Sequence, residues 1–148
     1  MSLIEQLQSD MKLAQKSKDV LKLSTIRMIL SSVSYAKIEK GRILTDDEVL
    51  EVLAKAAKQR KETIEAALKG GREAMAASEK QELEVIEAYL PAQLSPDEVE
   101  QIVRDTAAEL AITDIKMRGK LTGAVMQKLK ARADGKLVNA LVEKVLQG

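Results

Sequence analysis

The fold is decided by the stretch EAYLPAQLSPDE, residues 87–98. Pro91 ends the helix that comes before it, because the residue preceding a proline is pushed out of the helical region. A few residues later, Ser95, Pro96 and Glu98 begin another helix, with a serine cap, a proline at the first helical position and a glutamate that reaches back to the cap. The stretch therefore predicts a boundary at residues 90–94 with helices on both sides.

Helical patterns fill the chain on both sides of this boundary. The composition is rich in Ala, Leu, Lys, Glu and Gln, which favour helix, and no stretch alternates apolar and polar residues as a half-buried strand does. Capping-box patterns at Ser2, Thr45, Ser78 and Ser95 predict four helix starts. The predicted helices span residues 3–16, 19–40, 46–69, 79–89, 96–110, 118–130 and 135–146. Whether residues 72–76 form a short helical turn before the fourth helix stays undecided.

The predicted helices fall into two groups. Long helices occupy residues 1–90 and can pack as an N-terminal helical bundle, residues 91–94 form a linker, and residues 95–148 hold three short helices. The C-terminal lobe is small enough to have only marginal stability by itself. The sequence thus predicts an all-α fold with two lobes. Their cores must be aliphatic, because the 148 residues include no Phe or Trp and only two Tyr.

The composition excludes several kinds of function. The chain contains no Cys and no His, which removes thiol nucleophiles, Cys-ligated zinc and the commonest general base. Tyr35 and Tyr89 alone provide no platform on which single-stranded bases could stack. We therefore expect no cofactor, no metal and no catalytic residue. No apolar run reaches the roughly 18 residues of a membrane span, and residues 2–10 do not resemble a signal peptide, so we expect a soluble cytoplasmic protein without a membrane partner.

Charge is balanced overall, with 24 basic and 23 acidic residues, but its sign changes along the chain. Residues 79–109 hold nine acids and two bases, whereas residues 116–136 hold seven bases and one acid. Two interpretations stay open: the basic segment is a phosphate-binding patch for nucleic acid, or it is a solvated face whose charges pair with the preceding acidic helices. The seven bases are Lys116, Arg118, Lys120, Lys128, Lys130, Arg132 and Lys136.

Small and polar residues lie among these bases. Gly119 and Gly123 would let a phosphate approach free backbone N–H groups near a helix start. Asp134 followed by Gly135 is a turn signal, and Asp134 is a candidate cap for the last helix. Asn139 lies among apolar residues of that helix and either pairs with a backbone group or faces a ligand.

Two charged clusters in the N-terminal lobe are interpreted as surface features. A basic cluster on the third predicted helix has glutamates four residues after two of its members and predicts ordinary helix-surface salt bridges; it consists of Lys55, Lys58, Arg60 and Lys61. An acidic cluster lacks the histidines of a helical di-iron site and predicts a solvated helix face, with an all-carboxylate magnesium site of no distinctive spacing as the alternative; it consists of Glu79, Glu82, Glu84 and Glu87.

Five short motifs occur in a fixed order along nearly the whole chain. They are LSTIRM at 23–28, KQRK at 58–61, a segment from Glu82-Leu83 through Tyr89-Leu90-Pro91 to Gln93-Leu94-Ser95, Gly119-Lys120 with Gly123 and Met126, and Arg132-Ala133-Asp134-Gly135 with Val138-Asn139. Together they resemble the YqeY family, small bacterial proteins that share a domain with the tail of GatB, a subunit of glutamine-dependent Asp/Glu-tRNA amidotransferase.

The resemblance implies an all-helical, two-lobed fold whose C-terminal lobe matches the GatB tail, which resembles a tRNA-gripping module and not the catalytic centre. Matching the motif makes seven residues candidate RNA-facing or loop-shaping positions: Gly119, Lys120, Gly123, Arg132, Asp134, Gly135 and Asn139. The family commonly has Gly where this chain has Ala131. A binding loop that needs a positive φ at position 131 is therefore not expected, because Ala tolerates that conformation poorly.

Three functional hypotheses remain. The first is a non-catalytic tRNA-binding accessory domain that recognises RNA shape through phosphates and 2′-hydroxyls. The second, implied by the family relation, is carbon–nitrogen ligase activity with glutamine as amido donor, although no nucleophile–base pair or nucleotide loop supports it. The third is a module that docks on a protein partner. The candidate RNA-binding residues are Lys116, Arg118, Gly119, Lys120, Gly123, Lys128, Lys130, Arg132, Asp134, Gly135, Lys136 and Asn139.

Overall fold

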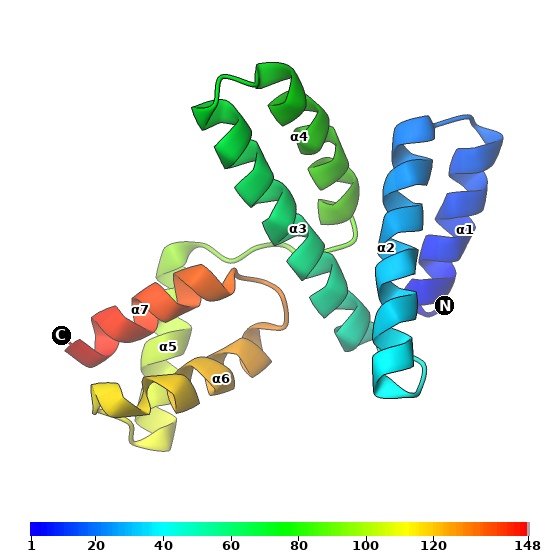
Figure 1. Ribbon diagram of the computed structural model, residues 1–148. Helices are drawn as coiled ribbons and strands as arrows, with labels where there is room; N and C mark the ends of the chain where they lie inside the picture. The colour runs from blue at the N-terminus through cyan, green and yellow to red at the C-terminus, as the bar shows by residue number, and fades with distance from the viewer. Residues whose placement is uncertain (148) are drawn as a thin grey trace. The chain divides into compact units, whose positions relative to one another are not determined.

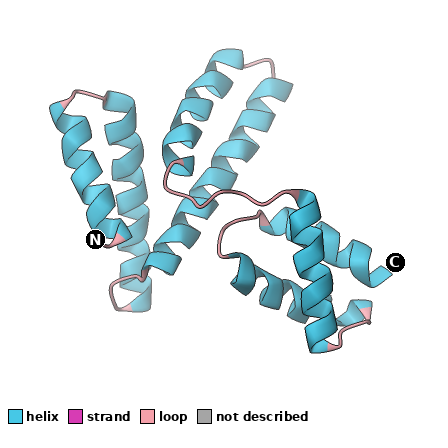
Figure 2. Ribbon diagram, turned by 180° about the vertical axis from the view of Figure 1, so that it is seen from behind, coloured by secondary structure: helices cyan, strands magenta, loops and turns pink. Residues whose placement is uncertain are grey.

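The computed structural model describes residues 1–147 (Figure 1). Within that range it has seven α-helices, one short 3₁₀ helix and no strand. Figure 2, coloured by secondary structure, shows helices joined by loops. The chain divides into two compact units, unit 1 from Met1 to Leu90 and unit 2 from Pro91 on. The predicted all-α fold class, with an N-terminal bundle and a small three-helix lobe, is confirmed.

Unit 1 consists of two helical hairpins (Figure 1). Helix α1 (Leu3–Lys16) packs on α2 (Val20–Lys40), and α3 (Asp46–Lys69) packs on α4 (Glu73–Glu87). The hairpins join because α2 also contacts both α3 and α4. The largest fully buried side chains of this core are aliphatic, as the shortage of aromatic residues predicts: Leu7, Ile26, Ile29, Val49, Leu53 and Ile86.

Two hydrogen bonds between distant residues close unit 1. The Tyr89 hydroxyl donates to the Asp10 carboxylate at 2.6 Å and thereby links the segment after α4 to α1. Burial of the Tyr89 ring, together with this hydrogen bond, raises the pKa of the phenol above its ordinary value. The backbone N–H of Leu3 donates to Asp46 at 3.0 Å, which links the starts of α1 and α3.

Local capping chemistry explains where the helices of unit 1 begin and end. The Thr45 hydroxyl accepts the N–H of Glu48 at 3.3 Å and the Glu48 carboxylate accepts the N–H of Thr45 at 2.9 Å, so the predicted capping box is complete. The Ser2 hydroxyl accepts the N–H of Glu5 at 3.2 Å. Gly41 ends α2 with a φ of 71°, which glycine adopts without steric penalty.

The predicted start of α4 at Ser78 is wrong, because α4 begins at Glu73 and Ser78 lies inside it. The turn at Gly70 and Gly71, with Gly71 at a φ of 71°, ends α3 and leads into α4 after a single further residue. Alanines at positions 74, 76 and 77 are strong helix formers that carry the helix through Ser78. A capping-box pattern inside such a segment therefore does not mark a helix start.

Unit 2 is a lobe of three α-helices. Helices α5 (Pro96–Leu110), α6 (Arg118–Leu129) and α7 (Gly135–Gln147) contact one another in pairs, and the 3₁₀ helix η1 (Ile115–Met117) leads into α6. Fully burying one aliphatic side chain contributes about 1.5–3 kcal/mol relative to leaving it exposed, so a small set can hold the lobe together. The most buried members of this core are Val99, Val103, Leu121, Val125, Leu129, Val138 and Val142.

The residues just before α5 are attached to unit 2. The N–H of Leu94 donates to the carbonyl of Arg132 at 2.8 Å, and the side-chain amide of Gln93 donates to the carbonyl of Ala131 at 2.9 Å. The Leu94 side chain packs against the core of this unit. Ser95 then forms the predicted capping box at the start of α5. Gln93 and Leu94, which the sequence places in a linker, are thus bound to the loop between α6 and α7.

Candidate nucleic-acid interface

Helix α6 places most of the predicted RNA-binding residues. Leu121, Val125 and Leu129 are each 0% exposed and hold one side of α6 on the core of unit 2. Gly119 and Gly123 lie on the opposite, exposed side, and a Cβ atom added to either glycine would meet nothing within 4 Å. Neither a close packing contact nor a positive φ requires glycine at these two positions. Their effect is to leave the backbone of α6 uncovered where a ligand could approach it.

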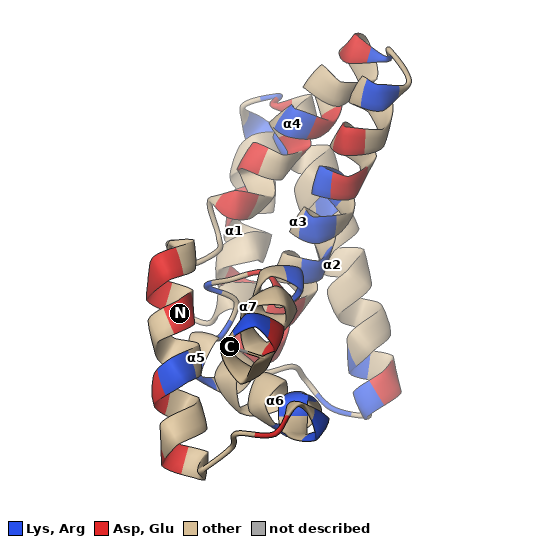
Figure 3. Ribbon diagram, turned by 90° about the vertical axis from the view of Figure 1, so that its left-hand side faces the viewer, with Lys and Arg blue, Asp and Glu red and all other residues tan. Residues whose placement is uncertain are grey.

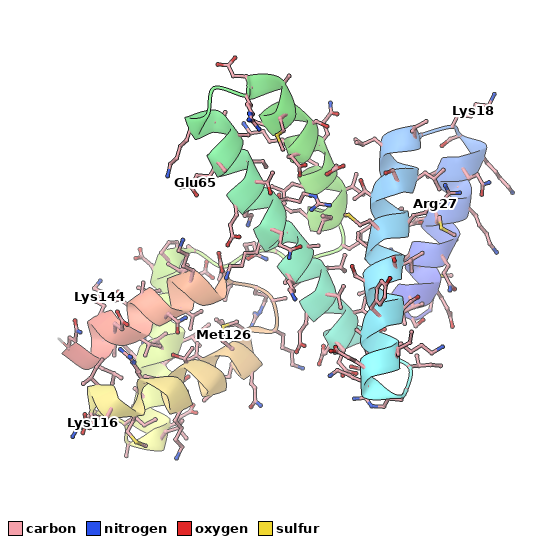
Figure 4. The ribbon with its side chains drawn as sticks, in the orientation of Figure 1. Lys18, Arg27, Glu65, Lys116, Met126 and Lys144 are labelled. Atoms are coloured by element: carbon pink, nitrogen blue, oxygen red, sulfur yellow. The ribbon has the colours of Figure 1, made fainter. Side chains whose placement is uncertain are left out.

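The α6-start cluster, defined as Lys116, Arg118 and Lys120, surrounds the beginning of α6, where Figure 4 labels Lys116. All three side chains are exposed. The N–H of Lys116 donates to the Asp114 carboxylate at 2.9 Å, which caps η1. Arg118 Nη1 lies 3.5 Å from a carboxylate oxygen of Glu143 on α7. Within residues 1–147, Lys116 and Lys120 have no ion-pair partner, so two of the three charges are available.

The α6-end cluster, defined as Lys128, Lys130, Arg132 and Lys136, surrounds the loop between α6 and α7. Lys128 Nζ lies 2.8 Å from Glu109 on α5. Arg132 donates from Nε to the carbonyl of residue 129 at 2.9 Å and from Nη2 to that of Lys128 at 3.0 Å. These bonds attach the Arg132 guanidinium to the last turn of α6, where the carbonyl of residue 129 also accepts the backbone N–H of Arg132 at 3.1 Å, so the guanidinium is used by the fold.

The loop between α6 and α7 has left-handed backbone at two successive residues. Lys130 has a φ of 45° and Ala131 a φ of 69°. The expectation that Ala131 prevents a loop with positive φ at this position is therefore wrong. The conformation costs roughly 1–2 kcal/mol for each residue other than glycine. The bonds that Gln93 and Leu94 donate to the carbonyls of Ala131 and Arg132 hold the loop in this conformation.

The remaining predicted residues lie at or near the start of α7. The Asp134 carboxylate accepts the N–H of Lys136 at 3.1 Å, which confirms the prediction that Asp134 caps this helix. Gly135 is the first residue of α7, and a Cβ atom there would contact the Cε of Met126 at 3.8 Å (Met126 is labelled in Figure 4). Asn139 is exposed on α7, and its amide makes no hydrogen bond within the described residues. The interpretation that Asn139 pairs with a backbone group is therefore not supported within the described residues, and contact with a ligand stays a prediction.

The structure brings the candidate residues together in two groups and not in one. Helix α6 has 12 residues, so the two clusters lie about 18 Å apart along its axis. Figure 3 shows basic segments on α6, whereas the charged segments of α5 are mostly acidic. The pair of Lys128 with Glu109 on α5 is of the kind that the solvated-face interpretation predicts, whereas Arg118 pairs with Glu143 on the later helix α7. Lys116, Lys120 and Lys136 have no such pair within residues 1–147, and phosphate binding by them stays a prediction.

Sequence analysis missed the role of Arg60 in unit 1. Its Nε lies 3.0 Å from Glu82 and 3.3 Å from Glu79 on α4, and its Nη2 lies 2.7 Å from the Met28 sulfur on α2. Arg60 therefore connects α3 to two neighbouring helices, and two members of the predicted solvated acidic face are its partners. A pairing between residues about 20 positions apart leaves no signal in the local spacing of charges, which reports only residues three or four apart.

A groove of about 790 Å³ lies between α3 and α4. Its charged lining has both signs, with Arg60 and Arg72 on one hand and Glu62 on the other, so it suits a polyanion less well than the ends of α6. No group of three or more metal-ligating side chains occurs in residues 1–147. None of the helices in the same range has the length and apolar character of a membrane span.

Comparison with known proteins gives one family. The family model described as "Yqey-like protein" matches residues 4–146. The protein named "Altered inheritance of mitochondria protein 41, mitochondrial" from Vanderwaltozyma polyspora is 36% identical over 113 residues, which cover 74% of this chain and 58% of the relative. The protein of the same name from Pyrenophora tritici-repentis is 28% identical over 147 residues, which cover 97% of this chain and 80% of the relative. The chain thus spans less than two thirds of the first relative.

Proposed function

The chain belongs to the YqeY-like protein family, and from this membership we propose that it is a non-catalytic accessory domain that binds tRNA. The observation that supports the proposal most strongly is the exposed side of α6, where the backbone at Gly119 and Gly123 is uncovered and exposed cations lie at both ends. Lys and Arg side chains supply most of the affinity for nucleic acid, because they release condensed counterions from the phosphates.

In this proposal the exposed side of α6 faces the RNA. Lys116 and Lys120 bind phosphates at the start of α6, and Lys136, in the first turn of α7, binds a phosphate beyond the far end of α6, a helix about 18 Å long. Both aromatic residues of the chain, Tyr35 and Tyr89, belong to unit 1, so unit 2 has no ring on which a base can stack. Recognition is therefore by shape, through phosphates and 2′-hydroxyls, which suits a base-paired stem better than an unpaired strand.

The test is tRNA binding by the full chain across a series of salt concentrations. If the three cations Lys116, Lys120 and Lys136 contact phosphates, log K should fall against log salt with a slope of about −2 to −3. Lys120→Gln and Lys136→Gln should each reduce the steepness by about 0.7–0.9. The matched control is Lys55→Gln, which removes one exposed charge from α3 in unit 1 and should leave the slope unchanged. Salt-independent binding, or turnover of misacylated tRNA by the chain alone, would overturn the proposal.

A second candidate function, docking on a protein partner, is favoured by the outer side of α2. Tyr35 and Ile38 are 73% and 77% exposed, lie three residues apart on α2 and are opposite the buried Ile26 and Ile29. Grouped exposed apolar residues of this kind mark interaction sites in soluble proteins. A protein captured by the full chain, retained after RNase treatment and lost with Ile38→Ser, would support this function. Capture that RNase abolishes would support the tRNA proposal instead.

A further inference from the structure

We infer that Glu109 and Glu143 hold down the affinity of this surface for RNA, because each carboxylate competes with phosphate for one cation. The inference rests on the proposed tRNA binding. Glu109 on α5 lies 2.8 Å from Lys128 Nζ, and Glu143 on α7 lies 3.5 Å from Arg118 Nη1. One such pair occupies each end of α6, so each cationic cluster has one charge that an acid of a neighbouring helix already holds.

The exposure of these pairs argues against a structural role. The four side chains are between 41% and 63% exposed, and exposed ion pairs contribute little to stability. Glu100 on α5 provides the contrast, because its side chain is 24% exposed and it binds both Lys144 and Arg104, at 2.6 Å and 3.3 Å. Glu100 links two helices from a sheltered position, whereas Glu109 and Glu143 mainly change how much positive charge the surface presents.

The competition has a definite effect on RNA binding. A phosphate that contacts Lys128 must displace the carboxylate of Glu109, and the released carboxylate then attracts cations from solution. The uptake of a solution cation by the freed carboxylate offsets the release of a counterion from the phosphate. A basic side chain that is already paired therefore adds little to the affinity for RNA or to the salt dependence of that affinity. Since exposed pairs open readily, the two glutamates weaken binding without preventing it.

The inference is tested with the full chain and a labelled, unmodified tRNA transcript. Removing the competitor with Glu109→Gln frees Lys128, and one extra phosphate contact at roughly 0.1 M monovalent salt is worth at most about eightfold in affinity. We expect a gain of about three- to eightfold and a salt slope steeper by about 0.7–0.9. Glu143→Gln should give a smaller gain because its pair is longer. Gains from the two ends of α6 should multiply, since distant sites act independently.

The matched control is Asp105→Asn, which adds the same unit of net charge one turn earlier on α5. The Asp105 carboxylate accepts the side-chain amide of Gln101 at 2.9 Å and, within residues 1–147, holds no cation. We expect less than a twofold change and an unaltered slope. Adding Lys128→Gln to Glu109→Gln should abolish the gain.

The outcomes separate the two ideas. If the unmodified chain binds tRNA but Glu109→Gln gains no more than Asp105→Asn, the inference is overturned and the proposed function stands. If the unmodified chain shows no binding to tRNA at any salt concentration, the proposed function fails and the inference fails with it. A gain specific to Glu109→Gln, abolished by Lys128→Gln, supports both.

Discussion

Replacing Ala131 with glycine should stabilise unit 2, although the change removes a methyl group. Ala131 has a φ of 69°, a conformation that costs roughly 1–2 kcal/mol for a residue with a Cβ atom and nothing comparable for glycine. Glycine also makes the unfolded chain more flexible, which offsets about 0.4–1 kcal/mol of that gain. The net stabilisation should be about 0.5–1 kcal/mol.

The assay is thermal and urea unfolding of the full chain, followed by circular dichroism. For a domain the size of unit 2, each kcal/mol shifts Tm by about 4–8 °C, so Ala131→Gly should raise Tm by about 2–8 °C. Ala140→Gly is the matched control, because Ala140 is exposed inside α7 and the same change there should cost about 1 kcal/mol. If both variants lose stability, the left-handed strain assigned to Ala131 is refuted.

Three further predictions follow from contacts of single side chains. Ser95→Ala should lower the free energy of unfolding by about 1 kcal/mol in urea, because it removes the cap of α5. Arg132→Gln should cost about 1–2 kcal/mol, since two hydrogen bonds to the carbonyls at the end of α6 are lost; a salt slope for tRNA that also falls would contradict a purely structural role. The hydrogen bond from Arg42 and the adjacent Lys40 hold the pKa of Glu48 well below its usual range. The unfolded chain therefore takes up this proton at higher pH than the folded chain, so stability should fall as the pH drops below about 4.5. Acid titration of the unfolding free energy should show a flatter dependence in Glu48→Gln, and an unchanged profile would count against the assignment.

Features that depend on a few neighbouring residues could be predicted from the sequence. The caps at Thr45 and Ser95 and the stop at Gly41 were found because side-chain chemistry within four residues determines them. The predicted helix start at Ser78 was wrong for a reason that is also local. The capping-box pattern is present there, but the alanine-rich residues before Ser78 already form the helix. Helix boundaries were thus predictable wherever no competing local preference overrode the cap.

The arrangement of the candidate interface was less predictable than its residue types. The basic segment is visible in the sequence, but its division into two clusters follows from the length of α6. The pair between Lys128 and Glu109 joins residues 19 positions apart, and no local spacing reports it. The positive φ of Ala131 depends on bonds from Gln93 and Leu94, which lie far away in sequence. Tertiary contacts therefore decided which cations are available.

The most direct test of the central claim compares the salt dependence of tRNA binding between the unmodified chain and the double variant Lys120→Gln/Lys136→Gln. Both lysines are exposed; Lys120 lies in the first turn of α6, and Lys136 lies in the first turn of α7, after the loop that follows α6. With the three cations Lys116, Lys120 and Lys136 on phosphates, the account predicts a slope of about −2 to −3 for the unmodified chain and a loss of about 1.4–1.8 from its steepness in the double variant. Identical slopes for the two proteins would show that the ends of α6 do not hold the RNA.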